Sequence, residues 1–244
     1  MDTPPTSTPL IRKLESILVL SDEERDVLRS VSGTIKTVGP RQDLVREGDR
    51  PSACCLILEG FAYRYELTHD GKRQIFSFHI PGDIPDLQSL HLDVMDHSLS
   101  ALSACKVMFI PHETVRDLIR RCPRIGDAFW RDTLIDGAVF REWMLCLGRR
   151  EAYGHMAHLL CELYVRLTAV GLTNGHEYAM PLTQAELGDA LGLSTVHVNR
   201  TVQELRGEGL IAMRAGSVVI LDWDRLREAG EFDPTYLHLK KDAA

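Results

Sequence analysis

Hydrophobic and polar positions divide the chain into three segments with different periodicities. From about Leu10 to Pro111, and after a short helical stretch near Asp22–Val31, strand-like runs alternate with glycine-containing turns. Short strands with a turn every ten or so residues are typical of an all-β barrel or roll. An Asp-Gly pair at Asp70-Gly71 predicts a hairpin between two of these runs. The strand-like runs are Ala53–Leu58, Phe61–Leu67, Gln74–Ile80 and Lys106–Ile110.

The second segment, from Glu113 to about Leu167, contains none of these turn signals, and Pro123 is placed for the first turn of a long helix. Two interpretations of its apolar stripe remain open. The stripe favours a dimerisation helix lying along a partner, with a helix packed on its own domain as the alternative. Asp132 and Asp136 interrupt it and argue against a regular coiled coil. The residues expected on the dimer helix are Ile125, Phe129, Ile135, Val139 and Trp143.

The third segment, from Tyr178 to Leu239, carries the most specific motif. Thr183 followed by Glu186 predicts a capping box at the start of a helix over Gln184–Leu191. Gly192 can adopt the left-handed conformation that ends this helix, and Ser194 is placed to cap a second helix over Thr195–Arg206. Two helices joined by a short turn that contains glycine form a helix-turn-helix.

The internal spacing of the third segment supports this interpretation. Gly188 lies where the two helices must approach closely, and the apolar residues of both helices can face inward together. A hairpin from Leu210 to Leu221 is expected to form a wing beside them. Arginine can pair with guanine, and asparagine or glutamine with adenine. The residues expected to contact DNA are Thr183, Thr195, Val196, His197, Asn199, Arg200 and Gln203.

Charge does not by itself identify a nucleic-acid-binding protein. The net charge is −7, and from Arg149 to Leu221 six arginines face seven acidic residues, a local balance of −1. Affinity for DNA would therefore depend on a few phosphate contacts per subunit, doubled in a dimer. A plain helical hairpin that caps a small domain is the alternative interpretation of the motif.

The order of the three segments, a β-roll, a long helix and a winged helix-turn-helix, resembles the Crp/Fnr family of bacterial transcription regulators. The glycine-turn motifs Arg46-Glu47-Gly48-Asp49, Asp70-Gly71-Lys72 and Pro81-Gly82-Asp83 match the rhythm of the family's cyclic-nucleotide-binding-like roll, and Leu182–Leu210 is similar to its helix-turn-helix. The resemblance implies an α+β fold built from an N-terminal antiparallel β-roll, a long dimerisation helix and a C-terminal winged helix-turn-helix. The expected parts are a disordered lead-in over residues 1–9, the roll over 10–122, the helix over 123–148 and the DNA-binding domain over 149–244.

The resemblance also implies a homodimer that binds double-stranded DNA at a two-fold symmetric operator, with RNA polymerase as a further partner. In the family pattern, the base-reading positions fall on Val196, Asn199 and Arg200, with Thr195 and His197 near phosphates. Val196 stands where the family often has glutamate. Valine cannot accept a hydrogen bond from cytosine, although it can touch a thymine methyl group. This departure leaves the target sequence open.

The effector site departs further from the family pattern. Members that bind cyclic AMP have a Gly-Glu pair for the ribose and an Arg-Ser pair for the phosphate, whereas this chain has Gly82-Asp83 and His97-Ser98. No lysine or arginine occurs from Gln74 to Cys105, so we expect uncompensated carboxylates to repel a phosphate and cyclic AMP not to be the ligand. No cysteine precedes Cys54, so the cysteine cluster of the oxygen-sensing branch is absent and an iron–sulfur cluster is not expected. The effector-pocket candidates are Asp83, Asp86, Leu87, His97 and Ser98.

The identity of the effector therefore stays unknown. The residue types of His91, Asp93, Asp96 and His97 suit a divalent metal, and a histidine of this group could hold a haem. A solvated polar loop is the alternative, as is an empty roll that only supports dimerisation.

Composition narrows the function classes. No apolar run reaches the length of a membrane helix and the N-terminus lacks the pattern of a secretion signal, so we expect a cytoplasmic protein with reduced thiols. An enzyme is not expected: His155 and His158 lack the glutamate of a zincin motif, and no phosphate-binding or dinucleotide-binding loop is present. The competing hypothesis is a small-molecule or metal sensor, or an interaction module, with a degenerate DNA-binding domain.

Overall fold

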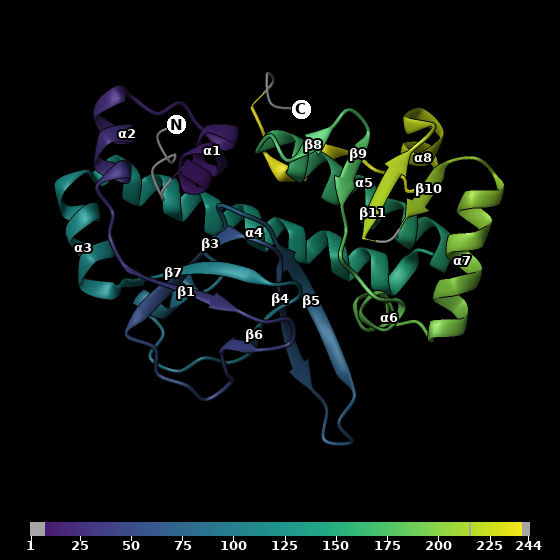
Figure 1. The fold of residues 1–244 in the computed structure, drawn as a ribbon, viewed down its shortest axis with the longest axis horizontal. Helices are drawn as coiled ribbons and strands as arrows, with labels where there is room; N and C mark the ends of the chain where they lie inside the picture. The colour runs from purple at the N-terminus through teal and green to yellow at the C-terminus, as the bar shows by residue number, and fades with distance from the viewer. Residues whose placement is uncertain (1–7, 215, 241–244) are drawn as a thin grey trace. The chain divides into compact units, whose positions relative to one another are not determined.

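The computed structural model describes residues 8–214 and 216–240, which form two compact units. The first contains the described residues through Leu67 together with Ser77–Asp136, and the second contains Thr68–Phe76 and the described residues from Gly137 onward. One long helix, α4 (Pro123–Arg149), contributes to both units (Figure 1). The sequence predicts a separate helical segment over residues 123–148, whereas the boundary between the two units falls inside α4, between Asp136 and Gly137.

Two antiparallel sheets form the roll, and their strands belong to the first unit except for residues 73–76, which the second unit contains. One has the order β1-β7-β3 and the other the order β2-β6-β4-β5. Their inner faces share a core that includes Cys55, Ile57, Leu99 and Val107, all at most 1% exposed. The predicted β-roll is therefore confirmed, with three short strands that the hydrophobic pattern did not predict (β1, β2 and β6). The strands are β1 (Thr34–Val38), β2 (Asp43–Val45), β3 (Ala53–Glu59), β4 (Ala62–Leu67), β5 (Arg73–His79), β6 (Ser98–Ala101) and β7 (Cys105–Pro111).

Short helices surround the roll: α1 (Thr8–Ile17), α2 (Asp22–Arg29), α3 (His112–Arg121) and the 3-10 helix η1 (Leu87–Leu90). Ser21 caps α2, where its hydroxyl accepts from the Glu24 amide at 3.2 Å and the Glu24 carboxylate accepts from the Ser21 amide at 2.7 Å. Of the expected disordered lead-in over 1–9, Thr8 and Pro9 belong to α1, and residues 1–7 lie outside the described residues.

Helix α4 buries the stripe that was a candidate dimer seam. Ile125, Phe129, Ile135, Val139 and Trp143 are all at most 7% exposed within a single chain. The Trp143 indole donates a hydrogen bond to the Glu162 carboxylate at 3.0 Å. These side chains are taken up by the protomer itself, so they do not offer a surface to a partner. The exposed apolar side chains of the same helix include Trp130 (64%), Leu134 (53%) and Met144 (72%).

The second unit packs helices against a small sheet of order β10-β11-β9-β8. Helix α5 (Ala152–Ala169) is buried along most of its length, and the Tyr178 hydroxyl donates to its Leu160 carbonyl at 2.9 Å. The remaining elements are β8 (Thr173–Asn174), β9 (Glu177–Ala179), α6 (Gln184–Leu191), α7 (Thr195–Gly207), β10 (Ile211–Arg214), β11 (Ser217–Ile220), α8 (Trp223–Ala229) and η2 (Pro234–Leu237). Among the described residues, none of the helices is both long and apolar enough to span a membrane.

Candidate nucleic-acid interface

Helix α6 begins and ends at the residues that the sequence indicates, whereas α7 begins at the expected Thr195 and ends at Gly207, one residue beyond the expected end. The Thr183 hydroxyl accepts from the Glu186 amide at 3.2 Å, and the Glu186 carboxylate accepts from the Thr183 amide at 2.8 Å, so the predicted capping box is present. Gly192 ends α6 at φ 68°, a conformation that side chains with a Cβ rarely adopt. Ser194 then accepts from the His197 amide at 3.3 Å and starts α7.

Gly188 is the point of closest approach between α6 and the turn. Its carbonyl accepts from the Leu193 amide at 3.0 Å, and a Cβ on Gly188 would lie 2.5 Å from the Leu193 carbonyl oxygen. Backbone at that distance cannot move aside cheaply, so the turn requires glycine. The inward side chains of the two helices are buried as expected: Leu187, Leu191, Val198, Val202 and Leu205.

The opposite face of α7 is exposed. Val196 has 78% of its surface accessible, although apolar side chains of this size are usually buried. Among the described residues, Asn199 and Arg200 form no hydrogen bond or ion pair, so their polar groups can reach a ligand without breaking contacts within the chain. The exposed candidate contacts on α7 are Thr195, Val196, His197, Asn199, Arg200 and Gln203.

Thr183 differs from the other candidate DNA contacts. Its side chain is exposed, but its hydroxyl already takes part in the capping box. Its first role is therefore to start α6, and a phosphate contact would have to share the hydroxyl that forms the cap.

The wing consists of β10 and β11, which pair from Ile211↔Ile220 to Arg214↔Ser217. Strand β9 extends this hairpin through Val218↔Tyr178, and β8 follows at the edge. The hydrophobic pattern does not predict β8 and β9, because they are only two and three residues long. The signal that could have found them is Gly175-His176, a two-residue hairpin turn with glycine first, in which Gly175 has φ 58° and Asn174 pairs with Glu177.

Two of the acidic residues in the helix-turn-helix are already neutralised or used locally. Asp189 on α6 forms an ion pair with Arg73, at 2.8 Å to Nε and 2.7 Å to a terminal nitrogen. Glu186 is 4% exposed and serves the capping box. Because Arg73 lies outside the range in which the local charge was counted, the electrostatic balance at the two helices is more favourable to DNA than −1 suggests.

The effector-pocket candidates lie in the first unit, and most form hydrogen bonds within the roll. The Asp83 carboxylate accepts from the Ile80 amide at 3.0 Å, and the Asp86 carboxylate accepts from the Cys55 amide at 2.7 Å. The Ser98 hydroxyl accepts from the Glu47 amide at 3.1 Å, and the Nδ1 atom of His97 lies 2.7 Å from the carboxylate of its neighbour Asp96. Leu87 lines a cavity of about 270 Å³ that Phe129 and Trp130 also border.

Cations compensate the carboxylates around this region. This corrects the expectation from the sequence that these carboxylates have no positive charge beside them. Lys13 of α1 approaches Asp83 at 2.8 Å and Asp132 at 3.4 Å. Arg64 of β4 approaches Asp136 at 2.5 Å and donates to the Pro85 carbonyl at 3.0 Å. Both cations come from outside the range Gln74–Cys105, where lysine and arginine are absent. Because carboxylates already surround them, these cations are poorly placed to hold a phosphate.

Burial raises the pKa of the Asp86 carboxyl from its usual 3.8 to about 6. Between these two pKa values the folded state holds a proton that the unfolded chain has released. The free energy of unfolding therefore falls as pH rises from 3.8 to about 6, by about 3 kcal/mol in total. We expect Asp86→Asn, which keeps an acceptor for the Cys55 amide, to remove this decline. Urea unfolding of both proteins from about pH 3.5 to about pH 7 covers the window between the two pKa values, and parallel profiles of stability against pH for the two proteins would contradict the expectation.

The loop candidates for a metal site do not come together. Among the described residues, His91, Asp93, Asp96 and His97 do not form a group of three close ligand atoms; Asp96 and His97 meet as an adjacent pair at 2.7 Å. The described residues place one such group elsewhere, at Glu142, Cys146 and His158 in the second unit.

Known proteins match both parts of the chain. The profile of the cyclic nucleotide-binding domain matches residues 35–122, and that of the Crp-like helix-turn-helix domain matches residues 154–229. Together with the winged helix-turn-helix, these matches define a DNA-binding transcription regulator rather than an enzyme.

The chain belongs to the Crp/Fnr family, whose members act as dimers. The transcriptional activator protein FnrL of Cereibacter sphaeroides is 31% identical over 198 residues, 78% of each chain. The anaerobic regulatory protein of Haemophilus influenzae is 25% identical, over 91% of this chain and 86% of that one. The solved structure of FixK2 from Bradyrhizobium japonicum has a TM-score of 0.71 at 21% identity, over 82% of this chain and 98% of that one. This likeness supports the fold.

Proposed function

We propose that this regulator acts as a homodimer on a two-fold symmetric operator, into whose major groove each subunit inserts α7. The observation that carries the proposal is the exposed outer face of α7, where Asn199 and Arg200 have no partners among the described residues. An α-helix fits the major groove, and a dimer of this class reads two half-sites about one helical turn apart.

Each polar group on α7 has a chemical counterpart on DNA. Arg200 can donate two hydrogen bonds to guanine, and Asn199 can pair with adenine. Val196 supplies an apolar surface for a thymine methyl group. Thr195 and His197 lie in the first turn of α7, where backbone amides and the helix dipole favour a phosphate. RNA polymerase is the expected protein partner of the bound dimer.

We also propose that cyclic AMP is not the signal. A cyclic nucleotide needs a cation for its phosphate, and the family position for that cation is His97, whose pKa is lowered by burial. Lys13 and Arg64 contact Asp83, Asp132 and Asp136 instead. An iron–sulfur cluster does not fit either, because no cysteine occurs before Cys54, and Cys54 and Cys55 are fully buried within a strand of the roll.

Selection from random duplex DNA tests the proposed function. We expect the wild-type chain to enrich an inverted repeat and to bind it with an affinity that falls steeply as salt rises. Adding cyclic AMP is expected to change neither the affinity for this operator nor the melting temperature. Enrichment of no sequence at low salt would instead favour an interaction module with a degenerate DNA-binding domain, and a cyclic-AMP-dependent gain in affinity would overturn the effector part.

A further inference from the structure

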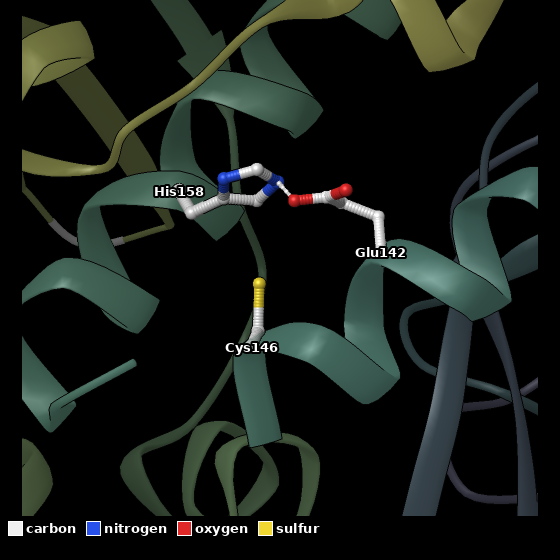
Figure 2. Close-up of side chains that lie close together, drawn as sticks. All are labelled: Glu142, Cys146 and His158. Carbon is white, nitrogen blue, oxygen red and sulfur yellow. Dashed lines mark ion pairs between the residues drawn. The ribbon is translucent and has the colours of Figure 1, made fainter. Parts of the chain in front are cut away.

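The second unit holds a group of side chains of metal-binding types, two of them buried, that DNA binding does not use. Glu142 and Cys146 lie one turn apart on α4, and His158 lies on α5. One ligand atom from each lies within 4.8 Å of the other two. Figure 2 shows the carboxylate, the thiol and the imidazole converging on a common space. Cys146 and His158 are each 1% exposed, which shields the group from solvent.

The His158 ring is oriented as a metal ligand would be. Its Nδ1 lies 3.0 Å from the Gly230 carbonyl, which can only accept, so Nδ1 carries the proton. With the proton on Nδ1, the ring presents the lone pair of Nε2. Ligand histidines are commonly held in this way, with the other ring nitrogen donating to a backbone carbonyl.

The Tyr236 hydroxyl lies next to Nε2 but need not donate its proton to the Nε2 lone pair. The Tyr236 hydroxyl lies 3.1 Å from Nε2 and 2.9 Å from the Glu162 carboxylate. A phenol has one proton, and both neighbours are acceptors. Donation to Glu162 leaves Nε2 facing an oxygen with no proton between them. A buried nitrogen without a committed donor therefore lies 3.8 Å from the Glu142 carboxylate.

The same space attracts positive charge. A terminal nitrogen of Arg150 lies 2.7 Å from the Glu142 carboxylate and 2.8 Å from the Cys146 sulfur. Nε of the same guanidinium is also 3.5 Å from the Glu231 carboxylate, which is exposed. Arg150 can thus shift toward Glu231 when another cation enters. The guanidinium shows that Glu142 and Cys146 already act together as a cation site.

We infer that Glu142, Cys146 and His158 form a binding site for a thiophilic divalent metal, with Zn²⁺ as the best match. Oxygen, sulfur and nitrogen donors together suit Zn²⁺ and exclude Mg²⁺ and Ca²⁺, which prefer oxygen alone. A fourth position is left for water. Binding replaces the S–H bond of Cys146 by a sulfur–metal bond and releases one proton per metal to solvent.

The net charge of the site stays zero when a metal ion takes the place of Arg150. Before the metal binds, the guanidinium of Arg150 offsets the carboxylate of Glu142, and the thiol and imidazole are neutral. After the metal binds, the divalent ion offsets one carboxylate and one thiolate, while Arg150 pairs with Glu231. The site is neutral in both states, so a buried net charge does not oppose metal entry.

Co²⁺ is the probe for the experiment, because its absorption reports both coordination number and thiolate ligation. The full chain, reduced and stripped with a chelator, is titrated with Co²⁺ and then with Zn²⁺. We expect one Co²⁺ per chain, d–d bands of four-coordinate strength, a sulfur-to-cobalt charge-transfer band, and displacement of all of them by Zn²⁺. One proton is released per metal in a weakly buffered solution.

Matched variants separate ligation from folding. Cys146→Ser is expected to remove the charge-transfer band, and His158→Ala to weaken binding at least about tenfold. Cys161→Ser and His155→Ala change buried residues of the same types on α5 and are expected to keep the spectrum. Arg150→Ala removes the competing cation and is expected to tighten Zn²⁺ binding. Absence of the charge-transfer band in the wild type, or its persistence in Cys146→Ser with native far-UV circular dichroism, would overturn the inference.

Discussion

Arg200→Ala is expected to weaken strongly the discrimination between the operator and unrelated DNA while the fold and the dimer stay intact. A bidentate arginine–guanine pair contributes about 1–3 kcal/mol of discrimination, and a symmetric dimer uses the pair twice. The combined loss corresponds to roughly 30-fold to 10⁴-fold in the ratio of specific to non-specific affinity. Because Arg200 is exposed and has no partner among the described residues, the change in the free energy of unfolding is expected to stay within about 0.5 kcal/mol.

Arg206→Ala is the matched control for this result. Arg206 also lies on α7 and is exposed, but it stands near the far end of the helix and donates to Gln203 at 3.3 Å. Its loss is expected to lower affinity for all DNA similarly, as loss of a phosphate contact does. Footprinting with the selected operator and a scrambled duplex distinguishes the two variants. A normal footprint for Arg200→Ala would show that α7 is not the reading helix.

Leu134→Glu combined with Met144→Glu is expected to convert the dimer to a monomer. These side chains are 53% and 72% exposed on α4 and have no role in the buried core of the single chain. Both lie among the exposed apolar side chains of α4, and we expect these side chains to contact the partner in place of the buried stripe. Two glutamates per protomer bring like charges together there and remove apolar contact area.

Loss of the dimer is expected to weaken operator binding by about 100-fold or more, because the second half-site no longer binds as part of the same molecule. Sedimentation velocity gives the oligomeric state, and a gel shift gives the affinity. Val19→Glu combined with Leu67→Glu, which alters exposed apolar residues outside α4, is the control and is expected to remain dimeric. A double variant that stays dimeric would place the interface on another surface.

The helix-turn-helix could be predicted from the sequence because local contacts determine it. The capping box of Thr183 and Glu186, the left-handed Gly192 and the crowded Gly188 each act within a few residues. The periodicity of buried and exposed positions on α7 follows from helix geometry alone. For these reasons the faces of α7 agree with expectation residue by residue.

The dimer seam could not be predicted in the same way. Periodicity identifies a stripe that will be buried, but it does not identify what buries it. Trp143 illustrates the difference, since its indole reaches a carboxylate on α5, 19 residues further along the same chain. The charge balance of the roll could not be predicted for the same reason. The cations at Asp83 and Asp136 are Lys13 and Arg64, which are distant in sequence.

The two faces of α7 have different tolerance to change. Inward residues such as Val198 and Leu205 are fully buried, and Gly188 beneath the turn admits no side chain. Outward residues such as Val196 and Asn199 contribute little to the packing of the chain. Mutation can therefore alter the recognised sequence one base contact at a time while the scaffold persists. The same separation makes this domain open to retargeting by substitutions at positions 196, 199 and 200, with the folding energy left largely unchanged.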